Sequence, residues 1–109
     1  MTGLTTHFLD IAHGRPGAGV LIELWSGDGR QLKVATTNAQ GRTDAPLLDG
    51  AALVAGPYRL VFHLGPYFAR LGVASFFDRA EVRFRMRRAE HCHVPLLAAP
   101  WGYSTYRGS

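Results

Sequence analysis

Several features that mark particular protein classes are scarce in this sequence. It holds one cysteine, Cys92, among 109 residues, so an intramolecular disulfide is excluded. No apolar run approaches the roughly 20 residues that cross a bilayer. The first residues have neither the basic stretch nor the long apolar core of a secretory signal peptide. We therefore expect a cytoplasmic protein with no membrane partner.

Lysine is also scarce, because Lys33 is the only one and arginine supplies almost all of the net charge of +4. A basic balance favours anionic partners in general. Nucleic-acid-binding proteins, however, usually gather their charge on one helix or ribbon with aromatic residues interleaved. The arginines at 83, 85, 87 and 88 instead alternate with apolar residues, as on the solvated face of an ordinary strand. We expect no nucleic-acid partner.

Turn-forming residues are abundant. Thirteen glycines and six prolines fall between short apolar runs, which indicates a β protein with many turns rather than a helical bundle. With 47% hydrophobic residues, a chain of this length can bury one core without disulfides or metal. We predict a single all-β domain over residues 1–109.

Alternation of apolar and polar residues predicts the elements of this domain. Strands are expected at residues 4–11, 20–25, 31–37, 42–43, 56–64, 80–88, 91–96 and 103–108. A short helix is expected at residues 66–71, with Pro66 in its first turn and Gly72 after it. The first four strands should form a meander of antiparallel hairpins. Eight short strands and one helix indicate a two-sheet sandwich.

Three histidines are expected on the outer face of a sheet. His91 and His93 are two residues apart on a strand and therefore share one face, away from Cys92. His7 meets His93 if their strands belong to one sheet. A His-x-His pair is either a pair of metal ligands or two hydrogen-bonded imidazoles. Because a third and fourth ligand are lacking, we expect no metal and no cofactor.

A cation and an ordered chain end complete the candidate site. Arg42 follows a glycine turn, and residues 102–109 are aromatic, β-branched and cationic to the last position, which favours a docked segment or an edge strand. Together with His7 and His93, Arg42 would supply acid-base groups beside a charge that stabilises a developing anion. Taken singly, each of these residues is more often an ordinary structural or surface residue.

Four segments in order resemble the 5-hydroxyisourate hydrolases, relatives of the thyroid-hormone carrier transthyretin. They are Leu4-Thr5-Thr6-His7 with Leu9-Asp10 and Gly14-Arg15-Pro16, residues 37–43 with Gly41-Arg42, residues 91–97, and the closing Tyr106-Arg107-Gly108-Ser109. The chain departs from the family at Cys92, where an aromatic residue is usual, and at Ala98 and Ala99. Alternation points Cys92 away from the histidine face, so we expect little consequence.

The resemblance implies a transthyretin-like sandwich that assembles as a homotetramer, a dimer of dimers with active sites at the mouths of a central channel. It implies hydrolysis of 5-hydroxyisourate to 2-oxo-4-hydroxy-4-carboxy-5-ureidoimidazoline in urate breakdown, by histidine-assisted attack of water on the cyclic amide. His7, Arg42 and His93 match the catalytic positions, and His7, Arg42, Tyr106 and Ser109 match the substrate-binding positions. The rival interpretation is a carrier that holds a hydrophobic hormone on the same scaffold.

Overall fold

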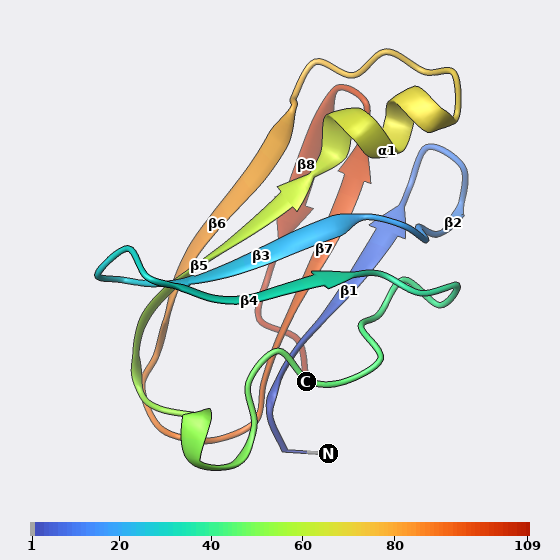
Figure 1. Cartoon of the computed structure of the whole chain (residues 1–109). Coiled ribbons are helices and arrows are strands. Elements are labelled where there is room, and N and C mark those ends of the chain that lie inside the picture. The colour runs from blue at the N-terminus through green and yellow to red at the C-terminus, as the bar shows by residue number, and fades with distance from the viewer. Residues whose placement is uncertain (1) are drawn as a thin grey trace.

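The computed structural model describes residues 2–109, which form two four-stranded sheets and one helix (Figure 1). The strand order is β2-β1-β7-β8 in one sheet and β4-β3-β5-β6 in the other. The strands are β1 (Leu4–Asp10), β2 (Arg15–Pro16), β3 (Leu21–Ser26), β4 (Gln31–Thr36), β5 (Gly56–His63), β6 (Arg79–Met86), β7 (Cys92–Ala99) and β8 (Gly102–Thr105). The helix α1 spans Leu64–Arg70, and a 3-10 turn spans Gly50–Ala52. The two-sheet sandwich predicted from the sequence is confirmed.

The core lies between the two sheets and follows the period-two alternation of the strands. On β1, Leu4, Thr6 and Phe8 are buried. Their neighbours Thr5 and His7 are half-buried on the opposite, outer face. The ring of Phe8 lies 6.5 Å from the ring of Phe62 on β5, so the two sheets pack directly against each other. The outer face of β1 is therefore left to carry polar side chains.

The strand β1 pairs in parallel with β7, from Leu4 opposite Cys92 to Asp10 opposite Ala98. Figure 1 shows the two strands side by side, with the start of β1 and the C-terminus at the same end of the sandwich. The expectation of a four-strand meander was wrong, because the neighbours of β1 are β2 and β7 rather than β3. Alternation fixes which face of a strand is buried, but it does not identify the strand's partner. The predicted hairpin between β3 and β4 is confirmed.

Two short segments also differ from the sequence prediction. Residues 42–43 form no strand, because the turn that includes Arg42 closes through the Asn38 amide, which donates to the Arg42 carbonyl at 2.7 Å. The structure has instead the short strand β2 at Arg15–Pro16, between the strands predicted at 4–11 and 20–25. The last predicted strand ends at Thr105, and Gly108 makes only an isolated bridge to His93.

The helix α1 is anchored to the far end of β1. The hydroxyl of Tyr67 donates to the carboxylate of the buried Asp10 at 2.7 Å, and His13 Nδ1 lies 2.7 Å from the same oxygen. Burial opposes ionisation of Asp10, but the hydrogen bonds from Tyr67 and His13 outweigh it and lower the pKa of that carboxyl. Burial and the Asp10 hydrogen bond raise the pKa of Tyr67 to about 12. The helix is thereby fixed over the sandwich.

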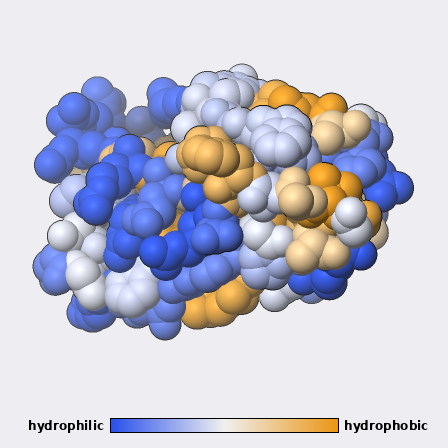
Figure 2. All heavy atoms as spheres, turned by 90° about the horizontal axis from the view of Figure 1, so that it is seen from above, coloured by the Kyte–Doolittle hydropathy of each residue, from blue (hydrophilic) through white to orange (hydrophobic). Residues whose placement is uncertain are grey.

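The surface is mixed at the end that carries α1 and the turn between β7 and β8. Seen from that side, hydrophobic patches stand among hydrophilic residues (Figure 2). Phe76 and Trp101 expose 73% and 74% of their surface, unusually large fractions for aromatic side chains. Among the helical residues that the structure describes, none form a helix long and apolar enough to cross a membrane.

Candidate active site

A cavity of about 550 Å³ opens beside the N-terminal ends of β1 and β7. Its wall is built by four separate parts of the chain: the start of β1, residues 42–46, the start of β7 and the C-terminal segment. The charged, imidazole and hydroxyl-bearing side chains among its residues are Thr5, Thr6, Arg42, Thr43, Asp44, His91, His93, Tyr106 and Ser109. A volume of this size suits a small-molecule ligand. Four of the five predicted site residues therefore meet at one cavity.

His93 lines this cavity from the outer face of β7. Its Nδ1 lies 2.8 Å from the hydroxyl of Thr5, which stands directly opposite it in the register of β1 and β7. Burial lowers the pKa of His93 below its ordinary value, and the positive charge of Arg42 lowers it further. The imidazole is therefore neutral at physiological pH, which is the form that accepts a proton.

His7 lies near this cavity but is not one of its lining residues. Its Nε2 is buried and has no hydrogen-bond partner among residues 2–109. Burial is the main cause that lowers the pKa of His7, and the charge of Arg42 adds to it, while a hydrogen bond to the backbone of Gln40 opposes both. The structure thus brings His7 next to the Arg42 loop and into the electrostatic environment of His93.

Arg42 reaches the cavity from a loop that lies directly on β1. Gly41 has a φ of 75°, and a side chain there would begin 2.4 Å from the Phe8 carbonyl oxygen. Only glycine combines this backbone conformation with such a close approach. The Phe8 amide donates to the Gly41 carbonyl at 2.7 Å and secures the loop. The exposed side chain of Arg42 follows immediately.

The C-terminal segment is docked against the histidine strand. The Gly108 amide donates to the His93 carbonyl at 2.7 Å, and a methyl group on Gly108 would lie 2.5 Å from His93 Cδ2. The Thr105 hydroxyl donates to the Pro95 carbonyl at 2.7 Å. Docking leaves Tyr106, which is 58% exposed, and Ser109 at the cavity. The predicted docking of this segment is confirmed.

Sequence reasoning missed two residues of the site, Thr5 and Asp44. Thr5 shares the outer face with His7, so alternation could have placed it on the histidine face, although its pairing with His93 depends on the register of β1 and β7. Asp44 is the one acidic side chain among the described residues of the cavity wall. No periodicity could have placed it there, because it lies in an irregular loop. Within residues 2–109, no three His, Cys, Asp or Glu side chains gather closely enough to hold a metal ion.

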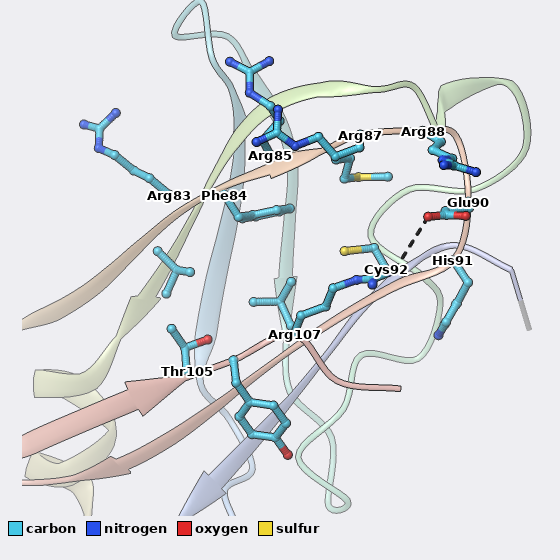
Figure 3. A pocket seen from close by; sticks show the side chains of 14 residues that line it. Arg83, Phe84, Arg85, Arg87, Arg88, Glu90, His91, Cys92, Thr105 and Arg107 are labelled. Atoms are coloured by element: carbon cyan, nitrogen blue, oxygen red, sulfur yellow. Dashed lines mark ion pairs between the residues drawn. The ribbon is translucent and has the colours of Figure 1, made fainter.

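A second cavity of about 350 Å³ lies between β6 and the strands β7 and β8 (Figure 3). Figure 3 shows Phe84 and Cys92 turned toward the space, whereas Arg83 and Arg85 extend away from it. Arg107 closes one side through an ion pair of 3.7 Å with Glu90. Its interior is mainly apolar, and Arg83 and Arg85 face outward, so this cavity lacks the converging acid-base groups of the larger one. The predicted solvated arginine face on β6 is confirmed.

The sequence and the fold both match known proteins. The HIUase/Transthyretin family matches residues 4–108. A relative from Mesorhizobium japonicum named 5-hydroxyisourate hydrolase is 51% identical, over 97% of this chain and 91% of the relative. The structure of Klebsiella pneumoniae 5-hydroxyisourate hydrolase is 45% identical with a TM-score of 0.88, and the match covers 100% of each chain.

Two other solved structures extend the comparison. A crystal structure of (S)-allantoin synthase is 36% identical with a TM-score of 0.93, and the match covers 98% of this chain but only 43% of that longer one. Sea bream transthyretin in complex with thyroxine is 28% identical with a TM-score of 0.88, over 96% of this chain and 93% of the other. The resemblance seen in the four sequence segments is confirmed, and the chain belongs to the HIUase/transthyretin family.

Proposed function

We propose that this protein is an enzyme that hydrolyses 5-hydroxyisourate to 2-oxo-4-hydroxy-4-carboxy-5-ureidoimidazoline in the breakdown of urate. Relatives that carry the name 5-hydroxyisourate hydrolase match nearly the whole chain at 51% and 49% identity. The cavity of about 550 Å³ accommodates a compact bicyclic substrate. The proposal depends above all on one observation: Arg42, His93 and Tyr106, from three distant parts of the chain, line that same cavity.

In the proposed mechanism, His93 is the general base that takes a proton from the attacking water. If Nδ1 of His93 donates to the Thr5 hydroxyl 2.8 Å away, Nε2 keeps its lone pair for the water. The lowered pKa of His93 keeps the ring neutral before the reaction. His93 is favoured over His7 for this role because His93 lines the cavity and His7 does not.

Arg42 stabilises the oxyanion that forms when water adds to the ring carbonyl. A guanidinium offers several N–H donors in a rigid fork, and its charge favours the tetrahedral intermediate over the neutral amide. Collapse of that intermediate breaks the carbon–nitrogen bond of the cyclic amide, and the leaving nitrogen takes a proton from the pair His7 and His93. His7 also lowers the pKa of His93, which helps to keep that ring neutral before the reaction.

Tyr106 and Ser109 bind and orient the substrate. Both lie on the wall of the cavity that Arg42 also lines. The half-exposed ring of Tyr106 supplies a flat surface for a planar substrate. A hormone carrier would need an apolar channel, whereas this wall carries an arginine, a carboxylate and two imidazoles. The polar wall therefore supports an enzyme rather than a carrier.

The same proposal includes a homotetramer, a dimer of dimers, located in the cytoplasm. The strands β6 and β8 are the outer strands of their sheets, with free edges within the described chain. Phe76 and Trp101 are exposed to an extent that a partner surface would relieve. The single cysteine is buried and unpaired, as is usual in a reducing compartment. Sedimentation velocity measures the assembly state, and a monomer at micromolar concentration would contradict the tetramer.

The decisive experiment follows the absorbance decay of freshly generated 5-hydroxyisourate with and without the protein. The enzyme should accelerate the decay and produce the carboxylated ureidoimidazoline. A matched sample lacking residues 106–109 should show a large loss of this acceleration. An unchanged spontaneous rate with the intact, folded protein would contradict the proposed function and favour the carrier.

A further inference from the structure

The loop that presents Arg42 is organised around a single side chain, that of Asn38. Its Oδ1 accepts the amide of Gln40 at 2.9 Å and the amide of Arg42 at 3.1 Å. The backbone of Asn38 closes the same turn, since its amide donates to the Arg42 carbonyl at 2.7 Å and its carbonyl accepts the Gly41 amide at 2.9 Å. Both backbone polar groups of Arg42 are thus bonded to Asn38.

The other end of the Asn38 amide reaches across the loop. Its Nδ2 donates to Oδ1 of Asp44 at 3.0 Å. Asp44 lies two residues beyond Arg42 and, like Arg42, lines the cavity of about 550 Å³. The Asn38 side chain therefore bridges the two sides of the segment on which Arg42 stands.

We propose that Asn38 and Asp44 form a clamp that fixes the Arg42 loop over the cavity, and that both are positioning residues for Arg42 in the hydrolysis. This inference rests on the proposed function, because it assigns Arg42 an effect on turnover. Gly41 is packed against β1, but the side chains of Arg42 and Asp44 that follow are exposed, so packing does not hold this part of the loop. The hydrogen bonds of the clamp therefore hold this part of the loop in a single conformation. That matters for catalysis, because a displacement of a charged group by about an ångström can lower the rate strongly.

The clamp needs an amide at position 38 and an acceptor at position 44. An amide offers one acceptor and one donor group, and Asn38 uses both. An aspartate at position 38 would still accept the two backbone amides, but it would turn a second carboxylate toward Asp44. Like charges at hydrogen-bond distance repel, and no donor remains between them. The two positions are therefore coupled in a way that simple loop stability does not require.

The test is an exchange of the two side chains, measured by kcat/KM in the 5-hydroxyisourate decay assay. Asn38→Asp should lose roughly tenfold, the size expected for loss of a hydrogen bond to a charged group. Asp44→Asn should lose less, because an amide oxygen at position 44 still accepts from Asn38. The double variant Asn38→Asp/Asp44→Asn restores one donor and one acceptor in reversed order. Its activity should return to that of Asp44→Asn alone.

A charge-matched control separates the clamp from the added negative charge. Gln40→Glu adds the same charge two residues along the loop, where the exposed side chain makes no hydrogen bond among the described residues. Its activity should stay within about twofold of wild type. A loss in Gln40→Glu as large as that in Asn38→Asp would overturn the clamp, because charge alone would then explain the defect.

The pH dependence gives a readout that a purely structural role would not move. In Asn38→Asp the two facing carboxyls share a proton at low pH, since repulsion raises the pKa of one of them. The deficit of Asn38→Asp relative to wild type should therefore narrow as the pH falls toward about 5. The double variant should show no such narrowing. A deficit that stays constant with pH would contradict the coupling of the two positions.

Hydrogen exchange tests the clamp independently of catalysis. Asn38→Ala removes the acceptor for the Gln40 and Arg42 amides, so exchange across residues 38–44 should become faster while the rest of the chain is unchanged. Unchanged exchange in this segment would overturn the inference. If wild type fails to accelerate 5-hydroxyisourate decay, the proposed function fails while the exchange result still decides the clamp. If wild type is active and the double variant is no better than Asn38→Asp, the clamp alone fails.

Discussion

The outer faces of the two sheets differ in whether their polar side chains have hydrogen-bond partners. On the sheet β4-β3-β5-β6, the carboxylate of Glu23 is bonded to Nε2 of His63 and accepts the Trp25 indole N–H at 3.1 Å. Arg59 and Glu81 form an ion pair of 2.9 Å on the same face. On the sheet β2-β1-β7-β8, His7 Nε2 is buried with no partner among residues 2–109.

The pKa values of the groups on the two faces reflect this difference. The hydrogen bond from His63 is the largest cause that lowers the pKa of Glu23, so this histidine is the hydrogen-bond partner of a carboxylate. Burial and the charge of Arg42 lower the pKa of both His7 and His93, for which no carboxylate compensates. Polar groups that are paired stabilise a fold, whereas buried titratable groups left without partners mark a functional site. Four experiments can break or sharpen this contrast.

The largest effect is expected when the histidines on the cavity side are replaced, in contrast to the histidine on the opposite sheet. His93→Ala and His7→Ala should each lower kcat/KM by roughly 10² to 10⁴, because a positioned acid or base is lost. His63→Ala, on the opposite sheet, should retain wild-type turnover within about twofold. Steady-state kinetics on the three folded variants provides the measurement. Wild-type turnover in His93→Ala would remove this residue from the mechanism.

A slightly smaller effect is expected for Arg42. Arg42→Ala should lower kcat by roughly 10² to 10³, as for other groups that stabilise an oxyanion. Arg42→Lys should not restore activity, since a lysine keeps the charge but loses the fork of donors. Arg59→Ala, which breaks the ion pair on the other sheet, is the matched arginine control. Equal losses in Arg42→Ala and Arg59→Ala would show that the two faces do not differ in function.

Docking of the C-terminal segment can be tested with a single methyl group. In Gly108→Ala the added carbon would lie 2.5 Å from His93 Cδ2, so the segment or the imidazole must shift. We expect a loss in kcat/KM on the order of tenfold, because small displacements of reacting groups are costly. Gly102→Ala is the control, since no atom lies within 4 Å of the added carbon. Equal activity of the two variants would argue against close packing on His93.

The smallest effect concerns the pH profile. Because the pKa of His93 is lowered, its neutral form persists below the ordinary histidine range, and the acidic limb of kcat/KM should lie below pH 6.5. Removing the positive charge with Arg42→Gln raises the pKa of His93, so the acidic limb of the residual activity should move to higher pH. Glu23→Gln on the other sheet should leave the limb in place. A limb that moves to lower pH in Arg42→Gln would have the wrong sign for this electrostatic effect.

The sequence predicted most of the fold, and the physical reason is that alternation is a local signal. Seven of the eight predicted strands lie where the structure has β1, β3, β4, β5, β6, β7 and β8, because apolar and polar residues alternate along most of them. The parallel pairing of β1 with β7 is not local, and no pattern within either strand specifies it. The Arg42 loop was predicted as a strand because the hydrogen bonds of Asn38 that bend it have no counterpart in hydrophobic periodicity.

The site was predictable in its residues more than in its geometry. The outward faces of His7 and His93 followed from alternation, but their different access to the cavity did not. The role of Thr5 as the partner of His93 depends on the register between β1 and β7, which is set by tertiary packing. The presence of Asp44 at the site could not be predicted, because it depends on the conformation of an irregular loop.

The parallel seam between β1 and β7 has a consequence for how activity arises during folding. Thr5 and His93 are 88 residues apart in the chain, yet they share a hydrogen bond at the edge of the cavity. Contacts of such long range pay a large loop-closure entropy and generally form late and slowly. Recovery of turnover after dilution from denaturant should therefore lag behind the formation of the β3–β4 hairpin and report completion of the whole molecule. Enzymatic turnover therefore reports that β1 and β7, from opposite ends of the chain, have paired.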